Sequence, residues 1–295
     1  MTDCRRKQLG LRLNQSQGFY PRKKKGIAVS IFKCTNCGLI YSNPMPKPEN
    51  INDHYGIDSN VYWPDEYFRV SDQDMVREVN TVKRLMKVQP GMKALDIGAG
   101  IGKAIIALQK QGFDAFGLEP SQTFFEYALN RMKIPEDRII CSSIEEAEFS
   151  PNQFDFINLF NVVEHVSHPY TTIEKAIKWL KPGGLIHIEV PYSKYLVSRI
   201  INTYYNLVGT NYVTHISPMH VPYHLYEFHQ KSFEIAVKRS GGSIVEMKVF
   251  AGGAVGIPFA ESKLLRNIMK WTDTGPDITV WITKNGVTTN ETIPM

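Results

Sequence analysis

One ten-residue stretch constrains the fold of this chain more than any other: residues 93–102, with the sequence Lys-Ala-Leu-Asp-Ile-Gly-Ala-Gly-Ile-Gly. Its apolar first half has the length of a buried parallel strand. Three glycines follow at alternate positions, Gly98, Gly100 and Gly102, and a helical pattern covers residues 103–111. Glycine permits a tight turn and lets a ligand approach the backbone, while a helix start offers N–H groups and a positive dipole end. The stretch therefore predicts a strand, a ligand-binding turn and a helix of an α/β domain.

Two kinds of cofactor suit such a turn. A dinucleotide site has the spacing G-x-G-x-x-G, whereas this chain has G-x-G-x-G, and Lys103 stands where the last glycine is expected. Asp96 lies two residues before the first glycine, where its carboxylate would repel a pyrophosphate and attract an ammonium group. S-adenosylmethionine (SAM), with an amino acid at one end and a nucleoside at the other, fits these residues better than NAD. A glycine-rich turn of an α/β domain with another role remains the alternative.

Strand and helix patterns alternate along the rest of the chain. Apolar or alternating runs predict strands at residues 93–97, 115–118, 138–141, 154–160, 185–190, 243–250 and 277–283. Helical patterns lie at residues 71–88, 102–111, 123–132, 170–180, 192–208, 231–239 and 261–271, and Ser71 is a candidate N-cap of the first. This repetition predicts an α/β fold with a Rossmann-like, doubly wound and mostly parallel sheet.

Composition divides the chain into three segments. Residues 1–48 are basic, with ten Lys or Arg and one acid, although the whole chain has a net charge of only +5. A solvated loop, or a patch that steers an anionic substrate or a membrane surface, would explain this bias. Residues 49–90 are expected to be an aromatic and helical cover. Residues 91–295 are expected to be the cofactor-binding domain, with an insertion at about 192–230.

Within the basic segment, Cys34-Thr-Asn-Cys37-Gly38 is a tight turn between two strand patterns. Two cysteines at this spacing suit one metal ion, and a structural zinc takes four protein ligands. Cys4 is a third candidate ligand, but Lys7 stands at the C-x-x-C position beside it. The sequence leaves open a zinc site with Cys4, Cys34 and Cys37 or a metal-free hairpin.

The carboxyl ends of the predicted strands carry candidate cofactor ligands, because open α/β sheets bind ligands at that edge. Glu119 ends the second strand, about 20 residues past the glycine turn, where an acid accepts hydrogen bonds from ribose hydroxyls. Its alternative role is to cap the helix that follows. Ser143 and Ile144 follow the third strand and could hold adenine by a hydroxyl or backbone contact and an apolar wall. Ser143 also suits a helix N-cap.

Asn161 and His165 follow the fourth strand, beside the expected position of the reactive methyl group. His165 could accept a proton from a hydroxyl, since an unperturbed histidine has a pKa near neutrality, or it could only hold the loop. His187 alternates into the fifth strand and is expected to be a core residue. Four histidines lie in residues 215–229, and because their spacing matches no metal-binding motif, a lid or surface role is expected for them.

These motifs occur in the order found in class I SAM-dependent methyltransferases, which residues 71–285 resemble. The matching segments are residues 95–102, 117–120, 154–155, 163–166 and 180–185. The resemblance implies SAM as the cofactor and a seven-stranded sheet whose last strand is antiparallel. The cofactor-binding residues that it implies are Asp96, Gly98, Gly100, Gly102, Glu119, Pro120, Ser143, Ile144 and Asn161.

The chain is most similar to the subgroup that includes ubiquinone-pathway O-methyltransferases and many sugar or glycan methyltransferases. Some members carry an N-terminal zinc knuckle that ends in C-x-x-C-G-L-I-Y-x-N-P-x-P, as residues 34–46 do here. Ubiquinone-type members often have an extra acid before the Glu-His pair that helps to bind a divalent metal, but Asn161 stands at that position. In similar enzymes the segment at residues 224–228 lies over the acceptor pocket, which makes His224 a second candidate base.

The predicted function is methyl transfer from SAM to a hydroxyl of a small-molecule or glycan-type acceptor, with His165 or His224 as the base. The alternative is a catalytically silent methyltransferase-like module whose basic N-terminus contacts nucleic acid or a protein partner. The intact cofactor motifs argue against it, so nucleic acid is not an expected partner. No apolar run reaches the roughly 20 residues that span a bilayer, no signal-peptide pattern is evident, and the chain has four cysteines. We therefore expect a cytoplasmic protein without a transmembrane segment.

Overall fold

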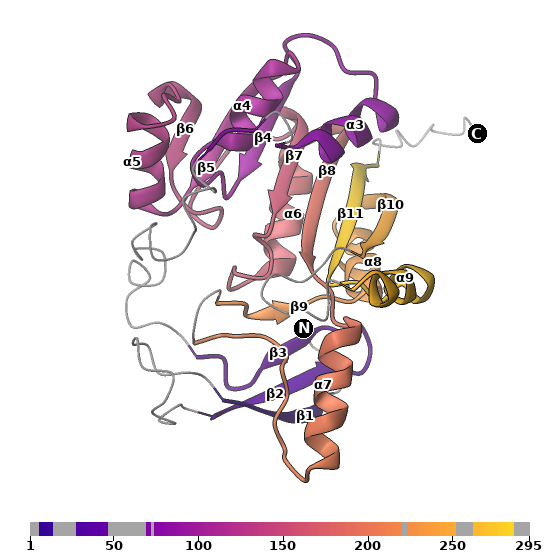
Figure 1. The fold of residues 1–295 in the computed structure, drawn as a ribbon. Helices are drawn as coiled ribbons and strands as arrows, with labels where there is room; N and C mark the ends of the chain where they lie inside the picture. Colours follow the sequence, from indigo (N-terminus) through magenta and orange to yellow (C-terminus); the bar gives the residue numbers. More distant parts are fainter. Residues whose placement is uncertain are drawn as a thin grey trace, which may run out of the picture.

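The computed structural model describes residues 6–13, 28–46, 69–71, 74–219, 223–251 and 262–285. These residues form two sheets, one of seven strands and one of four (Figure 1). The seven strands, in the order of the sheet, are β10 Gly242–Phe250, β11 Asp277–Lys284, β8 Leu180–Pro191, β7 Phe154–Phe160, β4 Lys93–Ile97, β5 Asp114–Glu119 and β6 Ile139–Cys141. Helices cover both faces of this sheet, which confirms the predicted Rossmann-like α/β fold.

The topology of the large sheet places a switch point beside β4. This strand lies between β5 and β7 and is parallel to both, and β6 and β8 continue the parallel order on either side. β11 is antiparallel to both of its neighbours, β8 and β10, so the prediction of an antiparallel last strand is confirmed. The chain leaves β4 toward β5 on one side and later returns as β7 on the other. In such sheets, ligands bind outside the carboxyl ends of the strands at this point.

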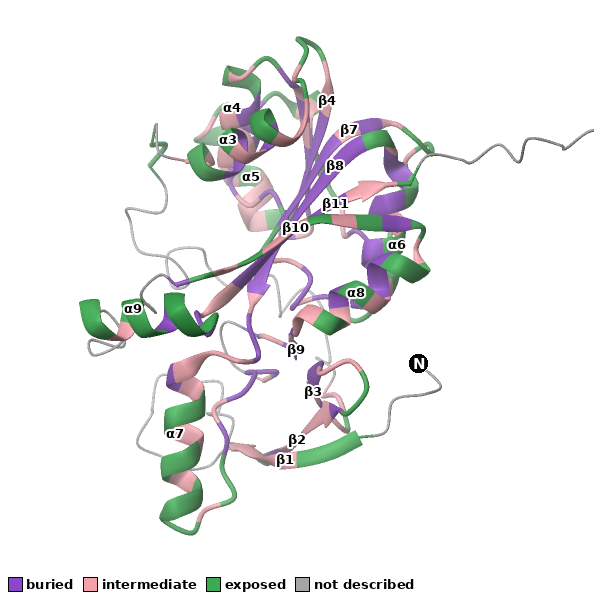
Figure 2. Ribbon diagram, turned by 90° about the vertical axis from the view of Figure 1, so that its right-hand side faces the viewer, coloured by how far each residue is buried: buried purple, intermediate pink, exposed green. Residues whose placement is uncertain are grey.

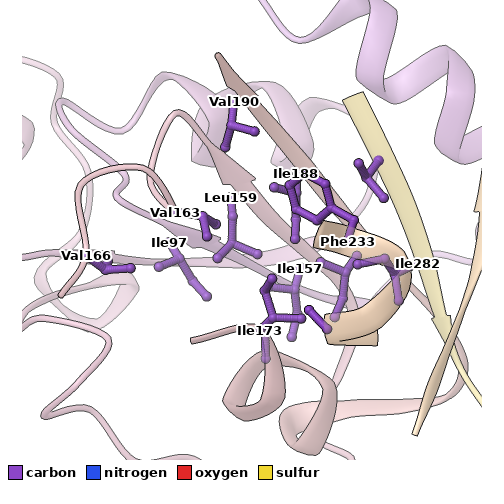
Figure 3. Packing of buried hydrophobic residues seen from close by; sticks show 14 of the residues in the cluster. Ile97, Ile157, Leu159, Val163, Val166, Ile173, Ile188, Val190, Phe233 and Ile282 are labelled. Carbon is purple, nitrogen blue, oxygen red and sulfur yellow. The ribbon is translucent and has the colours of Figure 1, made fainter. Parts of the chain in front are cut away.

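Alternation along the strands divides the core between two faces. One face carries Ala94 and Phe156 and packs against α3 (Val76–Leu85), α4 (Lys103–Lys110) and α5 (Gln122–Asn130). The other face carries Ile157 and Ile188 and packs against α6 (Pro169–Trp179) and α8 (Gln230–Arg239), where Phe233 joins the cluster (Figure 3). Both faces are apolar because helices cover the sheet on both sides.

The four-stranded antiparallel sheet joins two distant parts of the chain. Its strands, in order, are β1 Arg6–Leu13, β2 Ala28–Cys34, β3 Ile40–Ser42 and β9 Tyr226–Glu227. β3 pairs with β9, which comes from the region predicted as an insertion. Ile31 and Ile40 pack against Val213 and Ile216 of that region, whereas Cys34 joins the core on the α6 side of the large sheet. The basic segment and the insertion therefore share one sheet, and a common core holds it to the large sheet.

Several boundaries differ from the sequence-based prediction. α3 begins at Val76 and not at Ser71, and its N-cap is Met75. The backbone N–H of Ser71 donates to the Asp74 carboxylate at 2.8 Å. β8 begins at Leu180 and includes the turn expected before it. The prediction lacks β1 altogether. Much of the expected cover at residues 49–90 lies outside the described residues, which omit 47–68 and 72–73.

Two further helices, α7 (Leu196–Leu207) and α9 (Lys263–Thr272), lie on the same side of the molecule, at the left of Figure 2, and are largely exposed there. Among the residues that the structure describes, no helix combines the length and the apolar character that crossing a membrane requires.

Trp179 provides a test of the core. Its side chain is fully buried at the end of α6 and packs edge-to-face on Phe149, with ring centroids 5.0 Å apart. Trp179→Ala would leave a cavity in the core between α6 and the sheet, so we expect the free energy of unfolding to fall by about 3–5 kcal/mol. The matched control is Ile140→Ala on the edge strand β6, where the side chain is 48% exposed; the expected change is below about 0.5 kcal/mol. Urea denaturation measures both values, and similar losses would contradict this assignment of the core.

Candidate functional site

The glycine turn after β4 lies against both β5 and the loop that follows β7. The backbone N–H groups of Gly98 and Ala99 both donate to the carbonyl of Leu118, each at 2.8 Å. Gly98 has a φ of +72°, and a Cβ at this position would lie 2.5 Å from Cγ2 of Val162. Glycine is therefore required there both for its conformation and for space. The contact also packs the loop that leads to His165 directly onto the turn.

Glu119 ends β5 with its carboxylate beside this turn. Oε2 accepts a hydrogen bond from the N–H of Gly100 at 2.6 Å, and Oε1 accepts one from the N–H of Ser121 at 2.8 Å. Burial raises the pKa of Glu119 to about 7; the two hydrogen bonds act in the opposite direction, and nearby Asp96 adds to the rise. The helix α5 is capped by Ser121, whose hydroxyl accepts from the N–H of Phe124 at 3.4 Å. Capping is thus the role of Ser121 and not of Glu119.

Asp96 begins a row of side chains that crosses four strands on one face of the sheet. In strand register, Asp96 lies beside Asn158 of β7, and Asn158 lies beside His187 of β8. Trp281 of β11 comes next and stacks on the ring of His187, with centroids 4.5 Å apart. The amide of Asn158 donates to Asp96 Oδ1 at 2.6 Å, and its Oδ1 lies 2.7 Å from His187 Nδ1. Because an amide oxygen only accepts, Nδ1 of His187 carries the hydrogen.

Burial decides the charges in this row. It raises the pKa of Asp96 to about 7, although the hydrogen bond from Asn158 acts in the opposite direction. Burial also lowers the pKa of His187 to about 3, and the positive charge of Arg77 contributes to this decrease. His187 is therefore neutral near pH 7 and can act only as a fixed donor toward Asn158. The sequence analysis predicted His187 as a core residue but did not identify Asn158. The alternation within one strand does not show which residues of neighbouring strands lie side by side.

A second polar cluster lies on the same face, beyond His187. Ligand atoms of Glu78, His187 and Glu189 lie within 4.8 Å of one another. Arg77 of α3 forms ion pairs with Glu189 and, at 2.7 Å, with Glu78. Thr279 also donates to Glu189, at 2.8 Å. Because Arg77 already forms ion pairs with both carboxylates, we interpret the cluster as the anchor of α3 on the sheet and not as a cation site.

The turn after β6 holds the two residues predicted to contact adenine. The hydroxyl of Ser143 accepts a hydrogen bond from the N–H of Glu146 at 3.3 Å, but this bond closes a turn and does not cap a helix, because the described residues between β6 and β7 form no helix. Ile144 is buried and belongs to the core on the α6 side. The N–H of Ser142 donates to the carbonyl of Glu119 at 3.1 Å. The turn is therefore tied to the end of β5, beside the residue predicted to bind ribose.

His165 and His224 come together although they are far apart in the sequence. Their ring centroids are 5.0 Å apart, and Nδ1 of His165 lies 3.3 Å from the carbonyl oxygen of Tyr223. A carbonyl only accepts hydrogen bonds, so Nδ1 of His165 carries the hydrogen and Nε2 keeps its lone pair. The two histidines predicted as candidate bases thus form a pair, with the acceptor nitrogen of His165 fixed by a backbone contact.

Glu164 lies beside both rings. Its carboxylate is fully buried, and neither oxygen has a hydrogen-bond partner among the residues described. Oε1 lies 3.7 Å from Nε2 of His165 and 4.0 Å from Nε2 of His224. Burial raises the pKa of Glu164 well above its ordinary value. The three groups could share a proton, and their ligand atoms, all within 4.8 Å of one another, could also hold a metal ion. The sequence prediction omitted Glu164, although its position directly before His165 was an available signal.

Two other histidines near the insertion have structural roles. Nδ1 of His215 lies 2.6 Å from the carboxylate of Glu227 in β9, and the other carboxylate oxygen accepts from the N–H of Ile216. His229 caps α8, where its Nδ1 accepts from the N–H of Lys231 at 3.2 Å. His220 lies outside the described residues.

The described residues include two of the three cysteines considered for zinc. Cys34 is buried, and its Sγ lies 3.4 Å from the backbone N of Cys37. Gly38, with a positive φ, completes the turn. Within the described ranges, no third His, Cys, Asp or Glu side chain completes a metal-binding group with them. Cys4 lies outside those ranges. The described part of the chain therefore gives no support to a zinc site.

The fold and the site define a class of protein: a doubly wound α/β domain with acids at the ends of two adjacent strands and a glycine turn between them. A family model described as "Methyltransferase domain" matches residues 75–246, more than half of the chain. The chain belongs to this family, as its motifs predicted.

Similar proteins support the family but not a particular acceptor. The chain is 29% identical over 131 residues to a ubiquinone biosynthesis O-methyltransferase of Coxiella burnetii, a match that covers 43% of this chain and 53% of that protein. It is 30% identical over 111 residues to phosphoethanolamine N-methyltransferase 2 of Caenorhabditis elegans, which covers 36% and 25%. The chain thus spans about half or less of the length of these curated relatives.

Solved structures share the fold. A SAM-dependent methyltransferase from Archaeoglobus fulgidus aligns with a TM-score of 0.50 at 18% identity, over 74% of this chain and 97% of that one. Identity at this level supports the architecture alone.

The row of side chains from Asp96 to Trp281 leads to a testable prediction about SAM binding. His187→Phe keeps an aromatic ring against Trp281 but removes the hydrogen that fixes Asn158, so Asp96 loses an oriented donor. We expect SAM affinity to fall by up to about tenfold, the equivalent of one hydrogen bond, while the melting temperature stays within a few degrees. Calorimetric titration with SAM measures the first effect and thermal unfolding the second. Unchanged affinity, or an affinity loss that only accompanies unfolding, would contradict the role of the row.

Proposed function

We propose that this methyltransferase transfers the methyl group of SAM to a hydroxyl of a small-molecule or glycan-type acceptor. The observation that carries the proposal is the pair of His165 and His224 beside the buried Glu164. Glu164 and His165 lie on the loop after β7, which packs against the glycine turn through Val162, and His224 joins them from the segment before β9. A group that accepts a proton is needed next to the methyl donor when the acceptor is a hydroxyl. The low cysteine content of the chain supports a reducing compartment, the cytoplasm, for this reaction.

In this proposal the cofactor lies along the carboxyl ends of β4, β5 and β6. Asp96 attracts the ammonium group, and the glycine turn lies along the methionine part. The carboxylate of Glu119 accepts two backbone hydrogen bonds, and because a carboxylate has about four acceptor positions, it can also accept from the ribose hydroxyls. Pro120, Ser143 and Ile144 lie toward the adenine, and Asn161 lies toward the methyl group.

Methyl transfer in this site needs orientation more than activation. The acceptor oxygen attacks the methyl carbon while the carbon–sulfur bond breaks, and the electron pair stays on the sulfur of S-adenosylhomocysteine. The hydroxyl proton passes to the unprotonated Nε2 of His165 or to His224. In its ionised form Glu164, whose Oε1 lies 3.7 Å from Nε2 of His165 and 4.0 Å from Nε2 of His224, would favour the positive charge that develops on either ring. Correct alignment of donor and acceptor can supply about 7–11 kcal/mol of the barrier.

The two histidines can be separated from cofactor binding. His165→Ala and His224→Ala remove a candidate base without touching Asp96 or Glu119, so we expect kcat to fall by about 100-fold or more for at least one of them, with SAM affinity nearly unchanged. His168→Ala, at an exposed histidine of the same loop, is the matched control. The measurement is transfer of labelled methyl from SAM into acceptor fractions. Full activity in both variants would exclude a histidine base.

The raised pKa values of Asp96 and Glu119 predict a pH dependence. A carboxyl group whose folded pKa lies above its unfolded value binds its proton more tightly in the folded state, so it costs no stability near pH 4 and destabilises progressively up to about pH 7. Without SAM, the melting temperature should therefore fall between about pH 4 and pH 7, and Asp96→Asn should flatten that fall. SAM affinity should rise over the same window as the carboxylates ionise, and Asp96→Asn should lower it by about tenfold or more. An affinity independent of pH would contradict the charge pairing.

A screen of cell-extract fractions with radiolabelled SAM tests the function as a whole. Labelling of a small or glycan-type hydroxyl compound, lost in the histidine variants, is the expected result. Labelling of an amine or of protein would contradict the acceptor class. Salt-dependent nucleic-acid binding without any methyl transfer would instead favour the silent binding module.

A further inference from the structure

An apolar stripe lies exposed on α9, outside the methyltransferase site. Leu264, Ile268 and Trp271 follow one another at helical spacing, and their exposed fractions are 73%, 38% and 88%. The helix is held to the molecule on a different side, where Met269 is fully buried and Leu265 partly so. Exposed apolar side chains gathered on one face mark a contact surface, whereas scattered ones do not.

The same helix carries a basic stripe beside the apolar one. Lys263, Arg266 and Lys270 also recur at helical spacing, all three are exposed, and the helix contains no acid. Asp273 follows directly after it as the C-cap residue. A short helix with Trp and Leu on one side and Lys and Arg on the next is the pattern of helices that lie in the surface of a membrane. The basic side chains can then reach anionic head groups while their stems cover the apolar boundary.

A second exposed stripe extends this surface. Ile200, Tyr204 and Leu207 of α7 are 46%, 60% and 81% exposed and share one face of that helix. The start of α7 is tied to the end of α9, because the N–H of Leu196 donates to the carbonyl of Thr274 at 2.9 Å. Figure 2 shows both helices on the same side of the molecule. α7 contains one basic residue, Arg199, and no acid.

We propose that α9, extended by α7, docks this enzyme reversibly on an anionic membrane surface. Charge selects this partner over a second copy of the chain. A two-fold symmetric contact that covered both stripes would place the same face of each copy against the other, so the three cations of one α9 would lie against the three cations of its partner. An anionic bilayer complements both stripes at once. The proposal does not depend on the identity of the methyl acceptor.

Vesicle sedimentation with the full chain tests the contact. The wild-type protein should sediment with vesicles of phosphatidylcholine that contain phosphatidylglycerol, much less with phosphatidylcholine alone, and less as salt is added. Trp271 should move into an apolar environment, so fluorescence should shift to shorter wavelength on binding, and Trp271→Phe should remove most of that shift. No binding to the anionic vesicles would overturn the proposal.

Two variants separate the apolar and the basic contribution. Lys263→Gln with Arg266→Gln and Lys270→Gln should weaken vesicle binding by about 100-fold, since each charge near an anionic surface contributes about fivefold. Leu264→Ala with Trp271→Ala should weaken it by about tenfold or more. The matched control removes three exposed cations elsewhere, with Lys87→Gln, Arg131→Gln and Lys133→Gln, and should bind as the wild type does.

Other occupants of the surface give different results. If light scattering shows that the Leu264 and Trp271 variant converts a dimer into a monomer, the face is a contact between copies and the proposal is wrong. Equal losses in the α9 variant and in the control variant would show that binding follows net charge alone, which also overturns it. Melting temperatures near that of the wild type, measured for every variant, ensure that lost binding does not come from unfolding.

Discussion

The burial of two carboxylates at the ends of adjacent parallel strands is the constraint on which the rest of the structure depends. A buried carboxylate is costly unless donors or cations surround it. Asp96 has the amide of Asn158, and Glu119 has the backbone N–H groups of Gly100 and Ser121. Burial nevertheless raises both pKa values to about 7. A cofactor that brings an ammonium group and two hydroxyls would relieve this cost, which explains why SAM suits the site better than an anionic dinucleotide.

The N-terminal sheet links a remote part of the chain to the reactive end of this site. β3 pairs with β9, so residues 28–42 set the position of the segment that begins at Tyr223. That segment is also tied to the loop after β7 by two hydrogen bonds. The N–H of Leu225 donates to the backbone carbonyl of Glu164 at 2.8 Å, and the hydroxyl of Tyr226 donates to the backbone carbonyl of Ser167 at 3.0 Å. Both connections hold the segment of His224 beside the loop of His165. The small sheet therefore contributes to the site although it supplies none of the candidate bases.

The sequence predicted those parts of the molecule that depend on local pattern. The seven strands of the large sheet, the glycine turn and the acids at Asp96 and Glu119 follow from periodicity and from the edge at which such sheets bind ligands. The row from Asp96 to His187 could not be predicted, because it depends on register between strands that are far apart in the chain. The pairing of β3 with β9 was missed for the same reason. β1 was missed although Leu9, Leu11 and Leu13 alternate, because charged residues precede them.

The most direct test of the central claim is a structure of the complex with S-adenosylhomocysteine. We predict that the ammonium group lies at Asp96, that both ribose hydroxyls donate to Glu119, and that Asn158 still donates to Asp96. A nucleoside bound elsewhere, or a Glu119 carboxylate that keeps only its bonds to Gly100 and Ser121, would contradict it.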